Sequence, residues 1–350
     1  MYRKRYPLHF KQIAVRVLGL SHPNSGCGYH RVVLPLINMP EVKGIITNFP
    51  NEEILAEKYD ILLYNRVSQF DGNFDKVRQD LGCKIVVDMD DDWLLPSNHL
   101  NYYDYQEMNP RIEQNLRDAD LVTCTHARLA KRIYPFNKNV VILPNAIPFD
   151  VYQFTPEKVE DEKLRIFWAG GITHEGDLEI LKNPIRRLMA HKDSIKMVIG
   201  GYNDENHLSK WLWDKMVSYF TNSKKLEHTI LKGTTPDKYM SMYEQADIML
   251  VPLLQSDWAA GKSNLKLLEA SVKSVPVICS AVEPYINDFD APVLWVYKQS
   301  DWYKHLQFLI NDKEARLEYG QKINEWAKRK YNLTEVNVAR KAAFTNLINS

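Results

Sequence analysis

The chain has 350 residues, 45% of them hydrophobic and 25% charged, and a formal net charge of +1. This length predicts two domains of ordinary size, and a charge so near zero excludes a general electrostatic attraction to nucleic acid. No apolar run reaches the roughly 18 residues of a transmembrane helix, and the basic N-terminus does not continue into a signal-peptide pattern. The four cysteines form no CxxC pair, which excludes a cysteine metal cage and indicates a reducing, cytoplasmic location.

Short apolar runs alternate with amphipathic segments along the whole chain, a pattern typical of parallel sheets with crossover helices. In the first half the apolar runs predict strands at 13–18, 44–47, 61–64, 84–88, 121–123 and 140–143. Between them the periodicity predicts helices at 29–37, 73–81, 110–117 and 127–133. We therefore expect one open α/β domain over residues 1–155.

Polar segments follow several predicted strands of this half. Residues 26–31, Gly-Cys-Gly-Tyr-His-Arg, form a partial glycine loop without the GxGxxG pattern, which fits a ligand loop or a structural turn. Residues 88–92, Asp-Met-Asp-Asp-Asp, bring four carboxylates so close that they must repel unless a metal, arginines or open water compensate. His126 follows a later strand and fits either a ligand contact or a structural hydrogen bond.

The pattern restarts after a polar stretch at 155–163, which reads as an interdomain linker. Strands are predicted at 165–169, 196–199, 229–232, 247–251, 276–279 and 293–296. Helices are predicted at 176–190, 207–220, 235–245, 264–273 and 301–310, with further helical segments over 313–348. We expect a second Rossmann-like domain over 156–331, while the C-terminal helix, 332–350, can pack back on the first. Parallel sheets in this arrangement place a ligand in the cleft between their strand ends.

The most informative segment combines Gly-Lys-Ser-Asn-Leu-Lys-Leu-Leu-Glu-Ala at 261–270 with Ser-Val-Pro-Val-Ile-Cys-Ser at 274–280. It predicts a loop, a helix and a buried strand. Lys262 and Ser263 lie at the helix entrance, where free N–H groups and the helix dipole favour an anion. Glu269, two turns into the helix, can accept hydrogen bonds from two neighbouring sugar hydroxyls. Taken singly, these side chains also fit a solvated helix face.

This segment resembles the nucleotide-sugar signature of glycosyltransferases with two Rossmann-like domains, the GT-B architecture, and in particular the retaining "glycosyl transferases group 1" type. In that family a Glu, seven residues and a second Glu precede a Gly-Val-Pro-Val strand. Glu269 matches the second Glu, and residues 274–277 match the strand with Ser in place of Gly. The first Glu, which in the family usually faces the donor sugar, falls at Gly261, so sugar choice and part of the mechanism stay open.

The resemblance implies a donor site in the C-terminal domain, with Glu269 on the ribose of a nucleoside-diphosphate sugar, a UDP-sugar above all. The diphosphate would be held by Lys262, Ser263, Asn264, Leu265 and Lys266. Lys262 and Lys266 would also offset the charge that builds on the leaving diphosphate.

The same site would include the loop after the first strand of the C-terminal domain, residues 170–174. Its members expected at the diphosphate are Gly170, Gly171, Thr173 and His174. Glycines let a diphosphate approach backbone N–H groups closely, although a tight turn without a ligand fits equally well.

On the acceptor side the resemblance implies contacts from the N-terminal domain. The residues expected there are Gly28, Tyr29, His30, Arg31, Asp88 and Asp91. Asp90 would act as general base if the reaction inverts stereochemistry, and His126 would touch the donor sugar. The aspartates could instead form a DxD metal site, as in the single-domain GT-A enzymes, or a solvated loop. Because the segment at 262–269 already provides for the diphosphate, a divalent metal is possible but not expected.

We therefore expect a metal-independent, retaining glycosyltransferase that moves a sugar from a nucleoside-diphosphate sugar to a hydroxyl-bearing acceptor. Two alternatives remain open from the sequence: a nucleotide-sugar epimerase on the same fold and a non-catalytic two-domain binder of a nucleotide or sugar. A glycan, a lipid-linked sugar, a protein and a hydroxymethylated DNA base all remain candidates for the acceptor.

Overall fold

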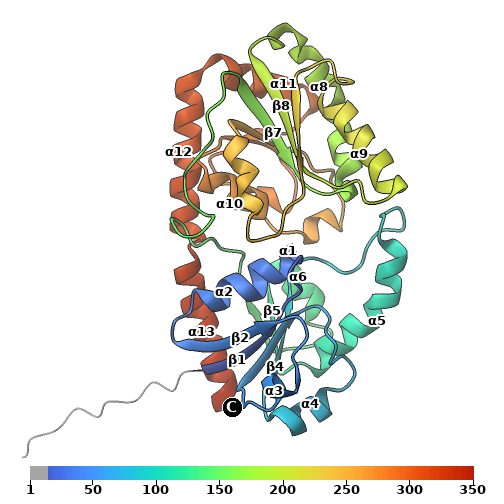
Figure 1. The fold of residues 1–350 in the computed structure, drawn as a ribbon, viewed down its shortest axis with the longest axis vertical. Coiled ribbons are helices and arrows are strands. Elements are labelled where there is room, and N and C mark those ends of the chain that lie inside the picture. Colours follow the sequence, from blue (N-terminus) through green and yellow to red (C-terminus); the bar gives the residue numbers. More distant parts are fainter. Residues whose placement is uncertain (1–14) are drawn as a thin grey trace, which may run out of the picture.

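The structure is a computed structural model that describes residues 15–350. Residues 1–14, which include the basic N-terminal segment and the first two residues of the strand predicted at 13–18, lie outside the described part. Figure 1 shows two lobes, each a sheet flanked by helices. The prediction of two Rossmann-like α/β domains with parallel sheets is confirmed.

The N-terminal sheet has six parallel strands in the order β2-β1-β3-β4-β5-β6. Its strands are β1 Val15–Leu20, β2 Val42–Thr47, β3 Ile61–Asn65, β4 Lys84–Met89, β5 Leu121–Cys124 and β6 Val140–Ile142. The intervening helices are α1 Gly26–Gly28, the π-helical η1 Tyr29–Val33, α2 Leu34–Ile37, α3 Glu52–Leu55, α4 Phe74–Leu81, α5 Tyr102–Asp118 and α6 Ala127–Ile133. The central strands are buried on both faces, which explains their continuous apolar runs.

The C-terminal sheet repeats this design in the order β12-β11-β10-β7-β8-β9. Its strands are β7 Leu164–Ala169, β8 Ile195–Tyr202, β9 His228–Lys232, β10 Ile248–Val251, β11 Val277–Ser280 and β12 Leu294–Val296. Its α-helices are α7 Glu175–Glu179, α8 Lys182–Arg187, α9 His207–Phe220, α10 Leu265–Val272 and α11 Gln299–Asn311. Short 3₁₀ turns complete it at η2 Ile172–His174, η3 Leu188–His191, η4 Tyr239–Ser241, η5 Tyr243–Gln245, η6 Ala259–Gly261 and η7 Tyr285–Asp288.

Three predicted helices differ from the structure. The helix predicted at 235–245 is wrong, because the chain forms only the turns η4 and η5, whose buried Met240 and Tyr243 are spaced by the three residues of a 3₁₀ turn. The helix predicted at 176–190 is broken into α7 and α8, and Pro184 lies in the first turn of α8, where its missing N–H costs nothing. The helix predicted at 110–117 begins much earlier, with Pro110 inside it.

Two long helices, α12 Lys313–Lys330 and α13 Leu333–Asn349, run along one side of both lobes (Figure 1). The structure places α13 against the N-terminal domain. The side-chain amide of Asn337 donates to the carbonyl of Pro35 at 3.0 Å, and Phe344 is buried in one hydrophobic cluster with Val15 and Val17 of β1. The last helix therefore packs on the N-terminal sheet.

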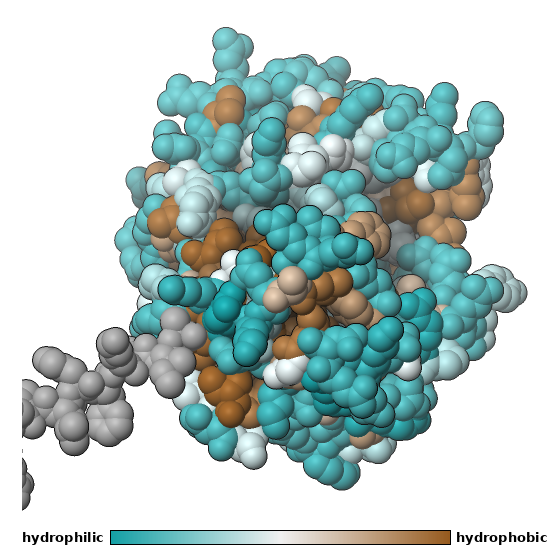
Figure 2. All heavy atoms as spheres, turned by 60° about the horizontal axis from the view of Figure 1, so that its bottom comes forward, coloured by the Kyte–Doolittle hydropathy of each residue, from teal (hydrophilic) through white to brown (hydrophobic). Residues whose placement is uncertain are grey.

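In both sheets the strand order reverses beside the first strand, between β1 and β3 and between β7 and β10. Ligands of open α/β sheets bind outside the carboxyl ends of the strands at such reversals. Figure 2 turns the N-terminal lobe toward the viewer and shows a mostly hydrophilic surface with hydrophobic side chains in separate groups. Within residues 15–350, none of the helices combines the length and apolar character that crossing a membrane requires.

Candidate active site between the two domains

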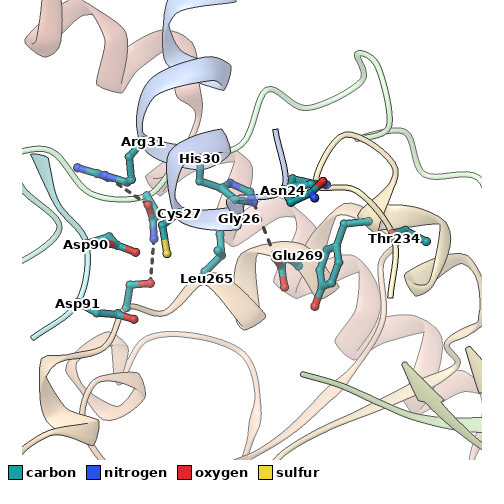
Figure 3. A pocket seen from close by; sticks show the side chains of 14 residues that line it. Asn24, Gly26, Cys27, His30, Arg31, Asp90, Asp91, Thr234, Leu265 and Glu269 are labelled. Atoms are coloured by element: carbon teal, nitrogen blue, oxygen red, sulfur yellow. Dashed lines mark hydrogen bonds and ion pairs between the residues drawn. The ribbon is translucent and has the colours of Figure 1, made fainter. Parts of the chain in front are cut away.

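A cavity of about 320 Å³ lies between the domains, and we call it the Glu269 cavity. Five segments form its walls: the segment after β1, the loop after β4, the loop after β6, the segment after β9 and the first two turns of α10 with Ser263 before them. It is lined by Asn24, Gly26, Cys27, His30, Arg31, Asp90, Asp91, Asn145, Thr234, Pro236, Tyr239, Ser263, Leu265 and Glu269. Figure 3 shows His30 and Glu269 pointing toward each other from the two domains.

The structure brings only part of the predicted site into this cavity. The predicted residues that line it are His30, Arg31, Asp90, Asp91, Ser263, Leu265 and Glu269. The others lie behind or beside it: Gly28, Tyr29, Asp88, His126, Gly170, Gly171, Thr173, His174, Lys262, Asn264 and Lys266. Gly28 packs so tightly that an added Cβ would lie 2.4 Å from Ser21 Oγ, and the Tyr29 hydroxyl accepts a hydrogen bond from Gln153 at 3.1 Å.

Glu269 is a buried carboxyl, 4% exposed, on the second turn of α10. The Tyr243 hydroxyl donates to its Oε2 at 2.5 Å, and His30 Nε2 lies 3.9 Å from its Oε1. Burial raises the pKa of Glu269 to about 7, although Lys266 and the Tyr243 hydrogen bond act in the opposite direction. Burial also lowers the pKa of His30 to about 4, so its imidazole is neutral at pH 7 and gives Glu269 no full counter-charge.

The start of α10 offers backbone donors to the same cavity. The first residues of any α-helix have no carbonyl within the helix to which their N–H groups can donate, so Leu265 and Lys266 present N–H groups for an anion. Their neighbours are held in place. Ser263 Oγ accepts from the Asn145 amide at 2.8 Å, and the Asn264 amide donates to Asp288 at 2.6 Å.

The two lysines predicted at the diphosphate point away from the Glu269 cavity. The Lys266 ammonium donates to the carbonyl of Ala169 at the end of β7, and burial lowers the pKa of this lysine. The Lys262 ammonium lies 4.2 Å from the ring centre of Trp258. Both cations nevertheless act on carboxyls that line the cavity, because Lys266 lowers the pKa of Glu269 and Lys262 lowers that of Asp91 against the effect of burial.

The loop after β7 lies on the far side of Lys266. His174 Nδ1 is 2.7 Å from Asp177 Oδ2, and burial lowers the pKa of His174 to about 4. Thr173 lines a separate cavity of about 520 Å³ together with Trp258 and His99. Gly170 is packed between Trp168 and His174, where an added Cβ would lie 2.7 Å from the indole. The loop is therefore a close turn at Gly170, and none of its residues lines the Glu269 cavity.

Arginines pair with three of the four carboxylates at 88–92, and Arg132, which pairs with Asp92, is the third of these arginines after Arg31 and Arg66. Arg31 binds both oxygens of Asp88, each at 2.9 Å, and both side chains are buried. The Thr123 hydroxyl donates to the same carboxylate at 2.5 Å. Arg66 donates to Asp90 at 2.7 and 3.0 Å. Burial alone would raise the pKa of Asp90, but Arg66 and its hydrogen bonds lower it to about 2.

Asp91 differs from these aspartates. Its side chain is 28% exposed, it lines the cavity, and its closest cation is Arg66 at 3.8 Å. Burial is the main cause that raises its pKa, while Lys262 acts in the opposite direction. Asp91 is thus better placed than Asp90 to accept a proton. Within residues 15–350 the side chains form no group of three or more His, Cys, Asp or Glu that could hold a metal ion.

Residue 261, where the family has its first Glu, is a glycine in this chain, and the structure leaves no room there for a side chain. A Cβ on residue 261 would lie 2.5 Å from the Cβ of Asp92, which is itself held by Arg132 at 2.9 Å. His126 approaches the same loop: its Nε2 is 3.2 Å from the Gly261 carbonyl oxygen, and its Nδ1 accepts from the Leu129 N–H. Its Nδ1 therefore caps the start of α6 within the N-terminal domain, and only its Nε2 takes part in the contact between the domains.

The sequence did not single out several residues of this site. Thr234, Pro236 and Tyr239 line the cavity after β9, and Tyr243 holds Glu269. The first three directly follow a predicted parallel strand, which is a usable signal because ligands gather at that end of such sheets. Tyr243 carried no such signal, since its role depends on a contact with a residue 26 positions later.

A scan against models of known protein families finds no match, and a search of curated proteins finds none either. Solved structures do match. HepE of Anabaena, in complex with UDP and glucose, superposes with a TM-score of 0.66 at 10% identity, over 95% of this chain and 100% of that one. Sucrose-phosphate synthase from Thermosynechococcus elongatus gives 0.63 at 14% identity, over 89% and 85%.

TarM gives a TM-score of 0.59 at 15% identity and matches 83% of this chain, which spans only 55% of TarM. Identities this low carry the fold alone. The order of both sheets and the cleft between them agree with that likeness. The chain therefore has the GT-B fold, in which two Rossmann-like domains face each other across a ligand cleft.

Proposed function

We propose that this chain transfers a glycosyl unit from a nucleoside-diphosphate sugar to a hydroxyl-bearing acceptor. The observation that carries the proposal is Glu269, a buried carboxyl at the cleft whose hydrogen-bond donor is a neutral hydroxyl. A carboxylate in that state can accept hydrogen bonds from the two hydroxyls of a ribose. The fold is shared with a protein solved with UDP and with UDP-glucose, which supports a UDP-sugar as the donor.

The other residues of the cavity support one orientation of the bound donor, with its base and its diphosphate on opposite sides of Glu269. Thr234, Pro236 and Tyr239 lie on the side of Glu269 where the base would follow the ribose. On the other side, the free N–H groups at the start of α10 suit the diphosphate. Lys266 would exchange the Ala169 carbonyl for a phosphate oxygen. Together these groups supply positive charge at the diphosphate, and we propose transfer without a divalent metal on that basis.

In the reaction the acceptor hydroxyl oxygen forms a bond to the anomeric carbon. The bond from that carbon to the diphosphate oxygen breaks, and its electron pair stays on the diphosphate, where α10 and the lysines offset the added charge. With retention, which we propose, the hydroxyl proton goes to the departing phosphate oxygen. With inversion it would go to Asp91, the partly exposed carboxyl of the cavity.

The test begins with a panel of nucleoside-diphosphate sugars, each measured for its shift of the melting temperature, since a ligand that binds the folded state raises it. The donor that shifts the melting temperature most is then incubated with the protein, with and without a mixture of neutral oligosaccharides as acceptors, and the products are analysed. Glycosyl transfer, or donor hydrolysis that is lost in Lys262→Ala, supports the proposal. An epimerised free nucleotide sugar, or binding without any turnover, would contradict it.

A further inference from the structure

A second cavity, of about 310 Å³, opens in the N-terminal domain beside the Glu269 cavity. It lies at the reversal of strand order between β1 and β3, outside the carboxyl ends of β1, β2 and β3. We call it the Phe49 cavity. Its lining residues are Leu20, Ser21, His22, Ser25, Gly28, Asn48, Phe49, Asn65, Arg66, Val67, Ser68, Gln69, Tyr105 and Met108. Its volume is at the lower end of the range for small-molecule sites.

Arg66 and Cys27 form the partition between the two cavities. Arg66 lines the Phe49 cavity, while Cys27 and Asp90, which it contacts at 3.6 and 2.7 Å, line the Glu269 cavity. Arg66 has a φ of 61°, in the left-handed region that a residue with a side chain seldom adopts. Such strain concentrates at functional sites because the surroundings must hold it. A ligand in the Phe49 cavity is therefore one side chain away from the proposed donor.

The lining is polar, and its one lysine or arginine side chain is already paired. This side chain is Arg66, and its donors are used by Asp90, Tyr105 and Cys27. The remaining polar groups are hydroxyls, the imidazole of His22 and the amides of Asn48, Asn65 and Gln69. These groups both donate and accept hydrogen bonds, as sugar hydroxyls do.

Phe49 gives the cavity an aromatic edge. Its side chain is 72% exposed directly after β2, although phenylalanine is among the residue types most often buried in proteins. An exposed ring beside uncharged hydrogen-bonding groups suits a ligand with an apolar face and a polar rim, which is the surface of a pyranose. A phosphorylated ligand or a nucleic-acid backbone would need free cations, and the lining supplies none beyond the paired Arg66.

We propose that the Phe49 cavity binds the acceptor, and that this acceptor is a neutral carbohydrate stacked on Phe49 and hydrogen-bonded by the surrounding amides. This rests on the proposed function for the identity of the reaction, but the binding itself does not require the donor. Arg31, predicted on the acceptor side, and Asp90, predicted as a general base, then lie on the donor side of the partition, because both line the Glu269 cavity and neither lines the Phe49 cavity.

The experiment measures sugar binding and donor binding separately. Saturation-transfer NMR is recorded with maltotriose, N-acetylated chitotriose and mannotriose, with and without UDP, and UDP binding is measured by calorimetry. Phe49→Ala should weaken the bound trisaccharide about tenfold or more, while Phe49→Trp keeps the affinity. Tyr297→Ala, which removes another exposed ring (74%) in the C-terminal domain, is the matched control and should change nothing.

The proposal is overturned if none of the three trisaccharides binds, or if Phe49→Ala binds them as well as the wild type does. It is also overturned if glucose 6-phosphate competes better than glucose, since that would show a phosphate site. UDP binding should be equal in all four proteins. A wild type that binds a trisaccharide but not UDP would contradict the proposed function and leave the Phe49 cavity supported.

Discussion

The buried carboxylates of the two domains, at or beside the same cleft, are in opposite electrostatic states. In the N-terminal domain, Asp88 and Asp90 are each held by an arginine, Arg31 and Arg66. In the C-terminal domain, Glu269 meets a tyrosine hydroxyl, and its oxygen is 3.9 Å from a histidine that is neutral at pH 7. A paired carboxylate has little capacity left for a ligand. We infer that the paired acids Asp88 and Asp90 maintain the shape of the cleft, whereas Glu269 is available to bind a ligand.

The largest effect on stability is expected when a buried acid of the N-terminal domain loses its arginine. Arg31→Ala would leave Asp88 buried without its cation, and we expect the free energy of unfolding to fall by about 3–5 kcal/mol. Urea titration followed by circular dichroism measures this. The double variant Arg31→Met with Asp88→Asn should recover part of the loss, because it removes both charges. Wild-type stability in Arg31→Ala would show that Asp88 does not depend on the pair.

Removing the unpaired acid should affect binding instead of folding. A hydrogen bond to a charged group contributes about 1.5–3 kcal/mol, so Glu269→Ala should weaken UDP-sugar binding by roughly 10- to 100-fold. Calorimetry with UDP-glucose is the measurement. Glu179→Ala removes a carboxylate from an exposed pair with Lys182 and serves as control. Equal donor affinity in the two variants would refute the role of Glu269.

The titration of Glu269 predicts that donor affinity depends on pH. With a pKa of about 7 in the folded state, this carboxyl loses its charge as the pH falls below 7, so UDP-glucose affinity should drop up to about tenfold between about pH 8 and about pH 6. Glu269→Gln should flatten this dependence. The folded protein binds this proton more tightly than the unfolded chain, whose value is near 4.5, so ionised Glu269 lowers stability progressively as the pH rises from about 4.5 to about 7.

The smallest effect is expected where a charge pair is exposed and distant from the cleft. Lys328 and Asp150 are 3.0 Å apart, with side chains 39% and 62% exposed. Lys328→Ala should change the free energy of unfolding by less than about 1 kcal/mol and leave UDP-glucose affinity unchanged. The same urea and calorimetry measurements apply. A large loss here would mean that charge pairing stabilises this protein generally, and the contrast with Arg31 would disappear.

Much of the fold could be predicted because strands buried on both faces are short apolar runs, and each observed strand lies within a few residues of its predicted range. Among the predicted site residues, Ser263, Leu265 and Glu269 come from one segment of the sequence, and all three line the cavity. What could not be predicted depends on distant partners. Arg31 and Asp88 are 57 residues apart, and the reason for Gly261 is Asp92 in the other domain.

We propose above all that Glu269 binds the ribose hydroxyls of a uridine nucleotide. The most direct test compares the binding of UDP and 2′,3′-dideoxy-UDP to the wild type and to Glu269→Ala by calorimetry. We predict that removing the two hydroxyls weakens binding to the wild type by about tenfold or more, and that it makes no further difference once the carboxylate is gone. If the wild type binds both nucleotides equally well, Glu269 does not hold the ribose, and the proposed donor site is wrong.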